Sequence, residues 1–349
     1  MKKLLPVLIM AIWALFSCTG SPSAGDSSSA PLWVRDAEKA FPDSEWVSYT
    51  GSGRDRNSAE SVAINSLAQR FHIDVKSIES SNQQFAHYIT NASGKKIDTY
   101  LQNREFALEQ VISSNVSGLV GVQLETWTAR DGTVHANARM NRRECSARYA
   151  AMIRENENLV HSLKEEAKRY PETFDACQML NFAFNVAQLT DNYYHLLGVL
   201  DPSTASKRPE YGNADTVKAL AQNAARSIVV TVNVQGNDEN GRISRAFSSY
   251  LSRQGFRTNT AGANSYMLNV LFKIEDLESM DEQLKFASYV LNYSVKNRGG
   301  LEVFSGSDSG KEGHTMASQA RQRVLFVAEV SIGSTGFAKK FDDYLASLL

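Results

Sequence analysis

The sequence predicts an α+β protein in which an antiparallel helical hairpin joins two two-layer α/β sandwich units with antiparallel or mixed sheets. Three observations support this prediction. Apolar and polar residues alternate, as they do in strands, within 119–140 and again within 266–304. Apolar residues recur at helical spacing over 149–197, and Pro171 divides that pattern in two. Helical patterns also accompany both groups of strands, as a two-layer sandwich requires.

The chain has 349 residues, which is the length of about two domains, and its 42% of hydrophobic residues can supply ordinary cores. We expect the two sandwich units at 32–143 and 214–349. The helical hairpin is expected between them, at 144–200.

Residues 1–17 are expected to be a lipoprotein signal peptide. Two lysines precede an apolar run at 4–16, and the junction Leu15-Phe16-Ser17-Cys18 resembles a bacterial lipobox. Cys18 is therefore the expected site of lipid attachment. The alternatives are a secretory signal without lipid and a retained membrane anchor, but the apolar run is shorter than the ~20 residues that span a bilayer.

Residues 18–31 are small and polar, and they are expected to form a flexible tether. The chain would then contact the membrane only through the lipid on Cys18. Thr19 follows the cysteine instead of the Asp that commonly retains lipoproteins in the inner membrane. The expected location is the outer membrane, with the folded part facing the periplasm or the cell surface.

The first unit is expected to begin with a strand at 45–49, followed by a helix. Asn57-Ser58-Ala59-Glu60 has the spacing of a capping box. On this prediction, Asn57 or Ser58 is the N-cap of the helix, and the Glu60 side chain reaches back to it.

Further strands are predicted at 72–78, 119–128 and 134–140, while 97–112 fits a strand or a helix. The pair Asp131-Gly132 between the last two strands is typical of a two-residue hairpin turn. This hairpin is the most strongly indicated local structure of the first unit.

Trp127 is expected on the same face of the hairpin as Val122 and Leu124. On this prediction it is a buried residue, and its loss would cost ~3–5 kcal/mol of stability. An exposed Trp127 would instead be a candidate for binding.

Several short motifs follow one another in the first unit. They are Pro31-x-Trp33, Tyr49-x-Gly51-x-Gly53, Leu67-Ala68 in an alanine-rich helix, Leu119-x-Gly121-Val122, Glu125-x-Trp127 and Ala138-Arg139-Met140-x-Arg142. This succession resembles the Lpp-twenty family of bacterial outer-membrane lipoproteins, whose fold is similar to the N-terminal domain of the flagellar protein FlgT. The resemblance implies an envelope protein without a defined molecular activity.

The helical hairpin determines what its two cysteines can do. Cys145 lies 26 residues before Pro171 and Cys177 only six after it, so they are offset by 26 − 6 = 20 residues, or ~30 Å, along antiparallel helices. A disulfide needs Cα atoms within ~7 Å. We therefore expect no disulfide between them within this hairpin.

The second unit is expected to contain six helices or strands before a final pair of helices. The predicted segments are a helix at 215–226, strands at 228–234, 266–274, 287–295 and 301–304, and helices at 243–251, 316–330 and 336–348. Phe247-x-x-Tyr250-Leu251-x-x-x-Gly255-Phe256 followed by a strand resembles the TolB-N-terminal and CsgG-like periplasmic domains. Because that group includes adaptor proteins, the resemblance implies a role in binding a partner.

No pattern in the sequence indicates a metal or cofactor site. The histidines are His72, His87, His135, His161, His195 and His314, and no two have the spacing of a shared metal ligand on one helix or strand. Gly51-x-Gly53-x-x-Arg56 lacks the third glycine of a dinucleotide-binding motif. Without residues 1–17 the chain has 37 − 2 = 35 basic and 38 acidic side chains, so no nucleic-acid partner is implied.

Catalytic residues are not indicated either. Asp238, Glu239, Asp276 and Glu278 could pair for acid chemistry, but they are expected in solvated loops. The serines lack the Gly-x-Ser-x-Gly and Ser-x-x-Lys contexts of serine nucleophiles.

Two functions of different classes fit these observations. The first is a non-catalytic envelope lipoprotein that binds an envelope protein of unknown identity, and the alternative is a periplasmic hydrolase of cell-wall or carbohydrate substrates. The candidate partner-binding residues are Phe182, Phe184, Tyr193 and Tyr194 on the second helix of the hairpin. If exposed, they would mark an interaction surface. Otherwise they pack within the hairpin and against the adjacent sheets.

Overall fold

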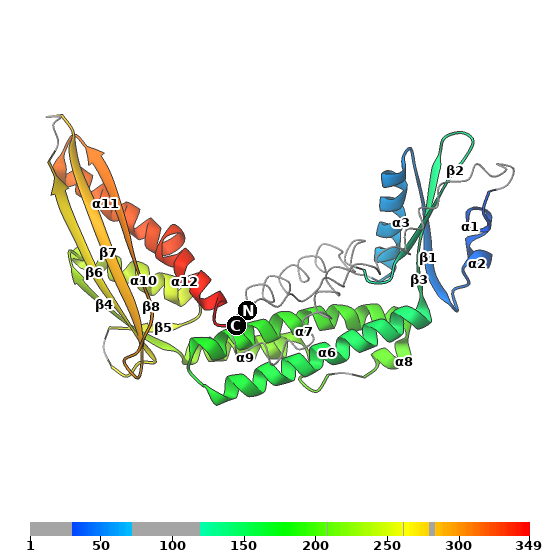
Figure 1. Cartoon of the computed structure of the whole chain (residues 1–349), viewed down its shortest axis with the longest axis horizontal. Coiled ribbons are helices and arrows are strands. Elements are labelled where there is room, and N and C mark those ends of the chain that lie inside the picture. Colours follow the sequence, from blue (N-terminus) through cyan, green and yellow to red (C-terminus); the bar gives the residue numbers. More distant parts are fainter. Residues whose placement is uncertain (1–29, 72–118, 208, 261, 279–282) are drawn as a thin grey trace, which may run out of the picture.

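The protein is described by a computed structural model for residues 30–71, 119–207, 209–260, 262–278 and 283–349. The expected signal peptide, Cys18 and most of the tether lie outside these residues, as do the segments 72–78 and 97–112. The molecule is elongated, with one sheet unit at each end of a helical middle (Figure 1). The α+β fold with two sheets and a packed helix pair is as predicted.

The first unit contains a three-stranded antiparallel sheet with the order β1-β3-β2. Its elements are α1 (Leu32–Arg35), α2 (Ala37–Ala40), β1 (Trp46–Gly53), α3 (Arg56–Arg70), β2 (Gln123–Thr128) and β3 (Val134–Asn141). Helix α3 packs on one face of the sheet through small residues such as Ala59 and Ala63, which are fully buried. The glycines of β1 allow this close approach, because a Cβ at Gly51 would lie 2.5 Å from the backbone nitrogen of Ala63.

The N-cap of α3 differs from the prediction. It is Asp55, whose extended backbone precedes the helix and whose carboxylate accepts a hydrogen bond from the Ser58 N–H at 2.8 Å. Glu60 does not complete a capping box, because its side chain pairs with Arg56 at 2.6 Å. The helix therefore begins one to two residues before the predicted cap.

The β2–β3 hairpin is confirmed, but its turn is longer than two residues. The Ala129 N–H donates to the Thr133 carbonyl at 2.8 Å, and Gly132 has a φ of +83°. This geometry is typical of a three-residue loop that places glycine in the left-handed conformation. Trp127 is half-buried and points to the face opposite Leu124, where its ring lies 5.8 Å from that of His135. The prediction that these residues share one face was wrong.

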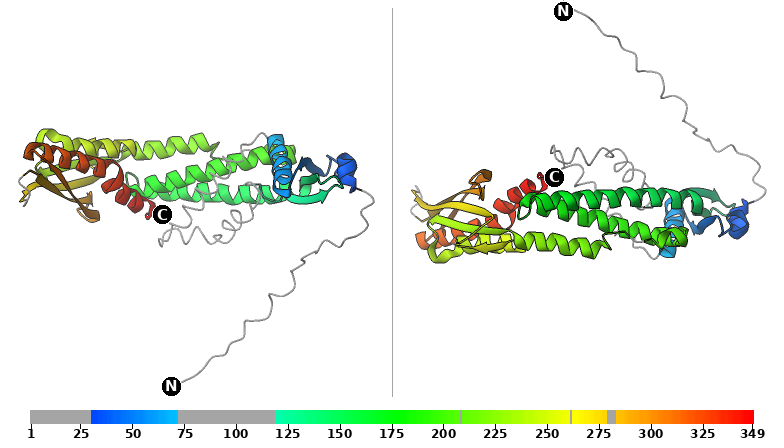
Figure 2. Two further views of the ribbon diagram at one scale, coloured as in Figure 1. Left: turned by 90° about the horizontal axis from the view of Figure 1, so that it is seen from above. Right: turned by 90° about the horizontal axis from the view of Figure 1, so that it is seen from below.

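The helical middle consists of α6 (Arg142–Arg169) and α7 (Phe174–Leu200), followed by α8 (Pro202–Ala205) and α9 (Ala214–Ser227). Helices α6 and α7 form the predicted antiparallel hairpin, and α9 packs along α7 (Figure 2). Cys145 and Cys177 are buried free thiols, and no disulfide joins them, as the offset between them predicts. None of the helices in the described ranges is long and apolar enough to cross a membrane.

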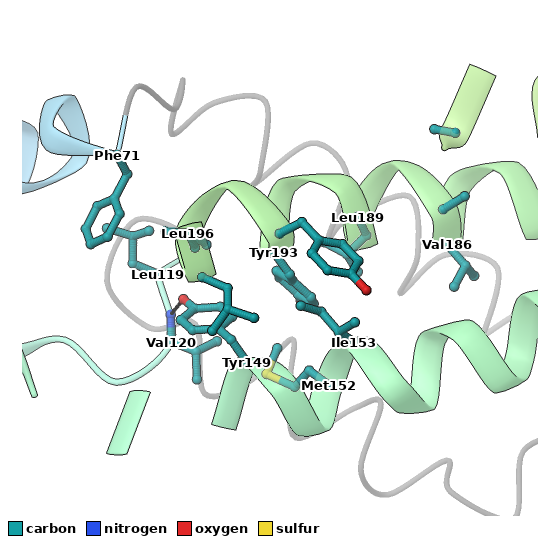
Figure 3. Packing of buried hydrophobic residues seen from close by; sticks show 14 of the residues in the cluster. Phe71, Leu119, Val120, Tyr149, Met152, Ile153, Val186, Leu189, Tyr193 and Leu196 are labelled. Carbon is teal, nitrogen blue, oxygen red and sulfur yellow. Dashed lines mark hydrogen bonds between the residues drawn. The ribbon is translucent and has the colours of Figure 1, made fainter. Parts of the chain in front are cut away.

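The first unit and the helical middle share one hydrophobic core. Figure 3 shows Leu119 of the first unit lying beside Phe71, and Val120 beside Tyr149 of α6, which contacts Tyr193 of α7. The rings of Tyr149 and Tyr193 are 5.4 Å apart, and the Tyr149 hydroxyl accepts a hydrogen bond from the Val120 N–H at 2.9 Å. The apolar stripe of the hairpin therefore packs against the first unit as well as between the two helices.

The second unit is a five-stranded mixed sheet with the order β5-β4-β6-β7-β8. Its elements are β4 (Val229–Gly236), η2 (Glu239–Gly241), α10 (Arg242–Arg253), β5 (Arg257–Asn259), β6 (Tyr266–Leu277), β7 (Lys285–Asn297), β8 (Glu302–His314), α11 (Ala317–Val330), η3 (Ser331–Thr335) and α12 (Phe337–Ala346). Strand β4 runs parallel to β5 and β6, and the other neighbours are antiparallel. Helices α10, α11 and α12 lie on one side of the sheet (Figure 1).

Strand β8 extends to His314, well beyond the predicted 301–304. The segment 305–314 contains glycines and polar residues but no large apolar side chain. The sequence therefore has no apolar–polar alternation there that could predict a strand. In the sheet, a Cβ at Gly306 would lie 2.7 Å from the Tyr293 hydroxyl, and one at Gly310 would lie 2.5 Å from the Tyr289 ring. These glycines therefore make room for aromatic rings of β7.

Candidate interaction surface

The aromatic residues that the sequence suggested for partner binding are core residues instead of an exposed patch. Phe182 and Tyr193 are fully buried, Tyr194 is buried, and Phe184 is half-buried. The Lys218 ammonium of α9 lies 5.6 Å from the centre of the Phe184 ring. Helix α9 packs along α7. It therefore covers the apolar residues of α7 that do not pack against α6.

Two of the four carboxylates considered for acid chemistry have structural partners, and the other two, Glu239 and Glu278, are exposed. Asp238 accepts hydrogen bonds from the backbone N–H groups of Ile243 and Ser244 at the start of α10. Asp276 lies in β6 and not in a loop, and both of its oxygens bind Arg321 at 2.7 Å. That guanidinium lowers the pKa of Asp276. These groups neither converge on one cavity nor belong to a potential metal site, of which the described residues contain none.

A serine, a carboxylate and a phenol do meet beneath η3. Asp308 of β8 accepts hydrogen bonds from Ser331 and, at 3.0 Å, from the Tyr289 hydroxyl. Ser331 is only 5% exposed, and no histidine side chain takes part in these bonds. The group therefore ties the π-helical turn η3 to the sheet and offers no accessible nucleophile.

The most distinctive surface is the uncovered face of the five-stranded sheet, which we call the open face. The even-numbered residues of β6 from Tyr266 to Phe272 are buried under the helices, and the odd-numbered ones point the other way. The open face presents Asn233, Gln235, Met267, Asn269, Leu271, Lys273, Glu275, Leu277, Phe286, Ser288, Val290, Asn292, Ser294, Lys296, Glu302, Ser305, Ser307, Ser309 and Lys311. It is thus rich in amides and hydroxyls.

Three apolar side chains lie exposed among these polar groups. Met267 and Leu271 are each 38% exposed, and Val290 is 42% exposed. A shallow hollow of about 360 Å³ runs between β4, β6 and β7 and is lined by amides such as Asn269 and Asn292. The Asn233 amide donates to that of Asn269 at 3.3 Å, which leaves most of their hydrogen-bonding capacity facing outward.

The open face also carries lysines that form no direct ion pair. Lys273, Lys296 and Lys311 make no ion pair with any described residue. Lys311 instead lies over the ring of Phe286, with 4.4 Å between its ammonium and the ring centre. The face is therefore a polar surface that carries three lysines and two glutamates, with apolar residues at its centre.

The apolar–polar alternation of β6 and β7 also indicates the residues of the open face. The alternation that places Leu268, Val270 and Phe272 in the core also places the intervening polar residues on one face. Whether helices cover that second face depends on how the connections cross the sheet, and alternation does not encode this.

No known protein family matches the chain, and no curated protein matches it in sequence. The resemblances to the Lpp-twenty family and to TolB-N-terminal and CsgG-like domains therefore stay predictions. A minor lipoprotein from Acinetobacter baumannii aligns with 34% of this chain and 90% of its own, at 10% identity and a TM-score of 0.26. A protein from Caulobacter crescentus assigned as a lipoprotein aligns with 34% of this chain and 88% of its own, at 12% identity and a TM-score of 0.25.

A secreted protein from Helicobacter pylori aligns over more of the chain. It covers 82% of this chain and 97% of its own, at 12% identity and a TM-score of 0.37. At these scores and identities, the similarities assign neither a family nor a function.

Proposed function

We propose that the chain is a non-catalytic envelope lipoprotein that binds a protein partner through the open face. The lipid on Cys18 would hold it at the outer membrane. The observation that carries the proposal is the uncovered sheet face with exposed Met267, Leu271 and Val290 among amides and unpaired lysines. Exposed apolar residues rimmed by polar groups are typical of interaction sites.

The size of the open face suits a protein partner. The strands β6, β7 and β8 have 12 or 13 residues each, which corresponds to about 40 Å at 3.3 Å per residue. Five strands spaced ~4.8 Å apart add a width of about 20 Å. The resulting area of about 800 Å² equals one side of a standard protein interface.

The chemistry of the open face indicates the kind of partner surface. Unpaired Lys273 and Lys296 favour carboxylates on the partner, and the amides can both donate to and accept from polar side chains or backbone. We therefore propose a partner that presents acidic residues around a small apolar centre.

The elongated architecture supports a role in reaching a partner. Helix α7 has 27 residues, or about 40 Å at 1.5 Å per residue, and it separates the two sheet units. With the expected tether before residue 32, this length would hold the open face away from the membrane. The alternative of a periplasmic hydrolase is favoured by no observation on the described residues.

Membrane attachment is tested by Cys18→Ala and a fatty-acid label. We expect label and membrane retention in the wild type and neither in the variant, which should remain folded and soluble. Equal retention of both proteins without label would reject the lipoprotein part of the proposal.

Partner binding is tested with a photoreactive residue at Leu271 or Val290 in native envelopes. A control at Phe326 places the same group on α11, on the covered side of the sheet, where the side chain is 61% exposed. We expect one protein to be captured from both open-face positions and not from Phe326. The purified partner should then bind the wild type. It should bind the double variant Lys273→Glu, Lys296→Glu at least tenfold more weakly.

If Leu271 and Val290 capture the same proteins as Phe326, or if the charge reversals leave the measured affinity unchanged, the open face is not the partner site.

A further inference from the structure

A groove lies where the tip of the helical hairpin meets α9. Helices α6 and α9 both pack against α7, and the groove runs between them. Its volume is about 300 Å³, at the small end of the range for ligand sites. The residues that matter for its chemistry are Lys164, Ala167, Ala176, Leu180, Leu220 and Ala224.

The interior of the groove is apolar because small and branched aliphatic side chains line it. Ala167 of α6 and Ala176 of α7 are buried at 5% and 3% exposure, and their small size leaves the space between the helices unfilled. Leu180 is half-buried and Leu220 is 39% exposed, so both offer apolar surface to an occupant. An aliphatic chain would remove this surface from water.

The wall formed by α6 carries positive charge. Lys164 is half-buried and forms no direct ion pair with a described residue, although it interacts electrostatically with the neighbouring Glu165 carboxylate. Lys168, one turn later, pairs with the exposed Glu165 at 2.5 Å. Glu172, the carboxylate in the lining, pairs with Arg298 at 3.1 Å and so does not neutralise Lys164. A half-buried ammonium that is not hydrogen-bonded to a carboxylate favours an anion in the adjacent apolar cavity.

We propose that this groove binds a single-chain amphiphile with an anionic head group. The acyl chain would lie over Ala176 and Leu180 between α6 and α9, and the carboxylate or phosphate head would contact Lys164 and Lys168. A free fatty acid and a lysophospholipid share this chemistry. The groove is independent of the proposed partner site on the open face.

Binding is measured by calorimetry on the full chain carrying Cys18→Ala, which has no lipid of its own. The probes are decanoate, decyl glucoside as an uncharged amphiphile with the same chain, and decanoyl lysophosphatidylglycerol, all below their micelle concentrations. We expect saturable binding of decanoate at one site and weaker binding of decyl glucoside. Tighter binding of the lysophospholipid than of decanoate would identify a phosphate head as the preferred source, and the reverse order would identify a carboxylate.

Two variants with matched controls locate the site. Lys164→Gln should weaken decanoate binding about threefold to tenfold, as expected for loss of a partly exposed charge interaction, and the exposed Lys339→Gln should not. Ala224→Trp fills the groove and should abolish binding, whereas Ala219→Trp, on an exposed position of the same helix, should keep it. If Ala224→Trp fails to fold, Leu220→Asp places a repelling carboxylate at the groove and should have the same effect.

Two results would overturn the proposal. One is the absence of saturable binding of both charged probes to the parent protein. The other is unchanged decanoate affinity in folded Ala224→Trp or Leu220→Asp.

Discussion

The ring of Phe174 stacks on the ring of Tyr266, with 3.8 Å between their centres and 13° between their planes. The Tyr266 hydroxyl also accepts a hydrogen bond from the Phe174 N–H at 3.0 Å. Phe174 begins α7 and Tyr266 begins β6, so this contact joins the helical middle to the second sheet. Phe174 is accordingly part of the C-terminal core, where its ring also meets Phe256 and Phe341.

Replacing Phe174 should therefore destabilise the second unit. Phe174→Ala removes a fully buried ring, and we expect a loss of about 3–5 kcal/mol in the free energy of unfolding. Tyr266→Phe keeps the stack but leaves the Phe174 N–H without its acceptor, and should cost about 1–2 kcal/mol. Urea unfolding measures both. Phe326→Ala, at a position 61% exposed, is the control and should change little.

The close approach of α3 to β1 gives a second prediction. A Cβ at Gly51 would lie within 2.6 Å of the Ala63 nitrogen and the Ala59 oxygen, which are backbone atoms that cannot rotate away. Gly51→Ala should therefore push the helix from the sheet and cost about 1–3 kcal/mol or more. Gly198→Ala in α7 meets no atom closer than 4.0 Å and should raise stability by up to about 1 kcal/mol. Equal melting temperatures for the two variants would contradict this account.

Elements with a clear period were predicted well from the sequence. The stripes of α6, α7 and α10 and the alternation of β6 and β7 each result from one buried face, which a local pattern encodes. The extent of β8 was missed because its pairing with β7 depends on glycines opposite aromatic rings. The cap of α3 was misplaced because several polar residues before the helix could serve, and only the backbone geometry of Asp55 decides between them.

The candidate surface was harder to predict than the fold. Phe184 and Tyr193 have the composition of an interaction patch, yet α9 and α6 bury them to different extents. Conversely, Asn269 and Asn292 have no motif, and they become neighbours on one surface only through the pairing of β6 with β7. Which faces are covered is a property of packing between distant segments.

The two cysteines of the described chain should be unreactive in the folded state. Burial raises the pKa of the Cys145 and Cys177 thiols to about 11 each, so almost no thiolate forms at neutral pH. In the Cys18→Ala variant we expect negligible labelling by a thiol reagent without denaturant and two labels per chain after unfolding. Prior treatment with a reductant should change neither number. Rapid labelling of the native protein would show that one of these thiols is accessible.

Asp201 gives a prediction about acid stability. It lies between α7 and α8, and its carboxylate accepts hydrogen bonds from the side chains and backbone N–H groups of Ser203 and Thr204. These bonds lower the pKa of Asp201 to about 2. Because this value is below the ordinary ~3.9 of the unfolded chain, the carboxylate contributes stability above pH ~4 that is lost as the pH falls towards 2.

Asp201→Ala should therefore cost about 1 kcal/mol at pH 7, the typical value of an N-cap. The difference from the wild type should shrink as the pH falls from about 4 to about 2, where the wild-type carboxyl becomes protonated. Asp201→Asn is the control, because an amide can cap α8 without titrating. The stability difference between Asp201→Asn and Asp201→Ala should not change between pH 4 and pH 2. Thermal melts at pH 7, 4 and 2.5 measure these differences. A wild-type advantage over Asp201→Ala that is equal at all three pH values would show that the carboxylate charge does not stabilise this turn.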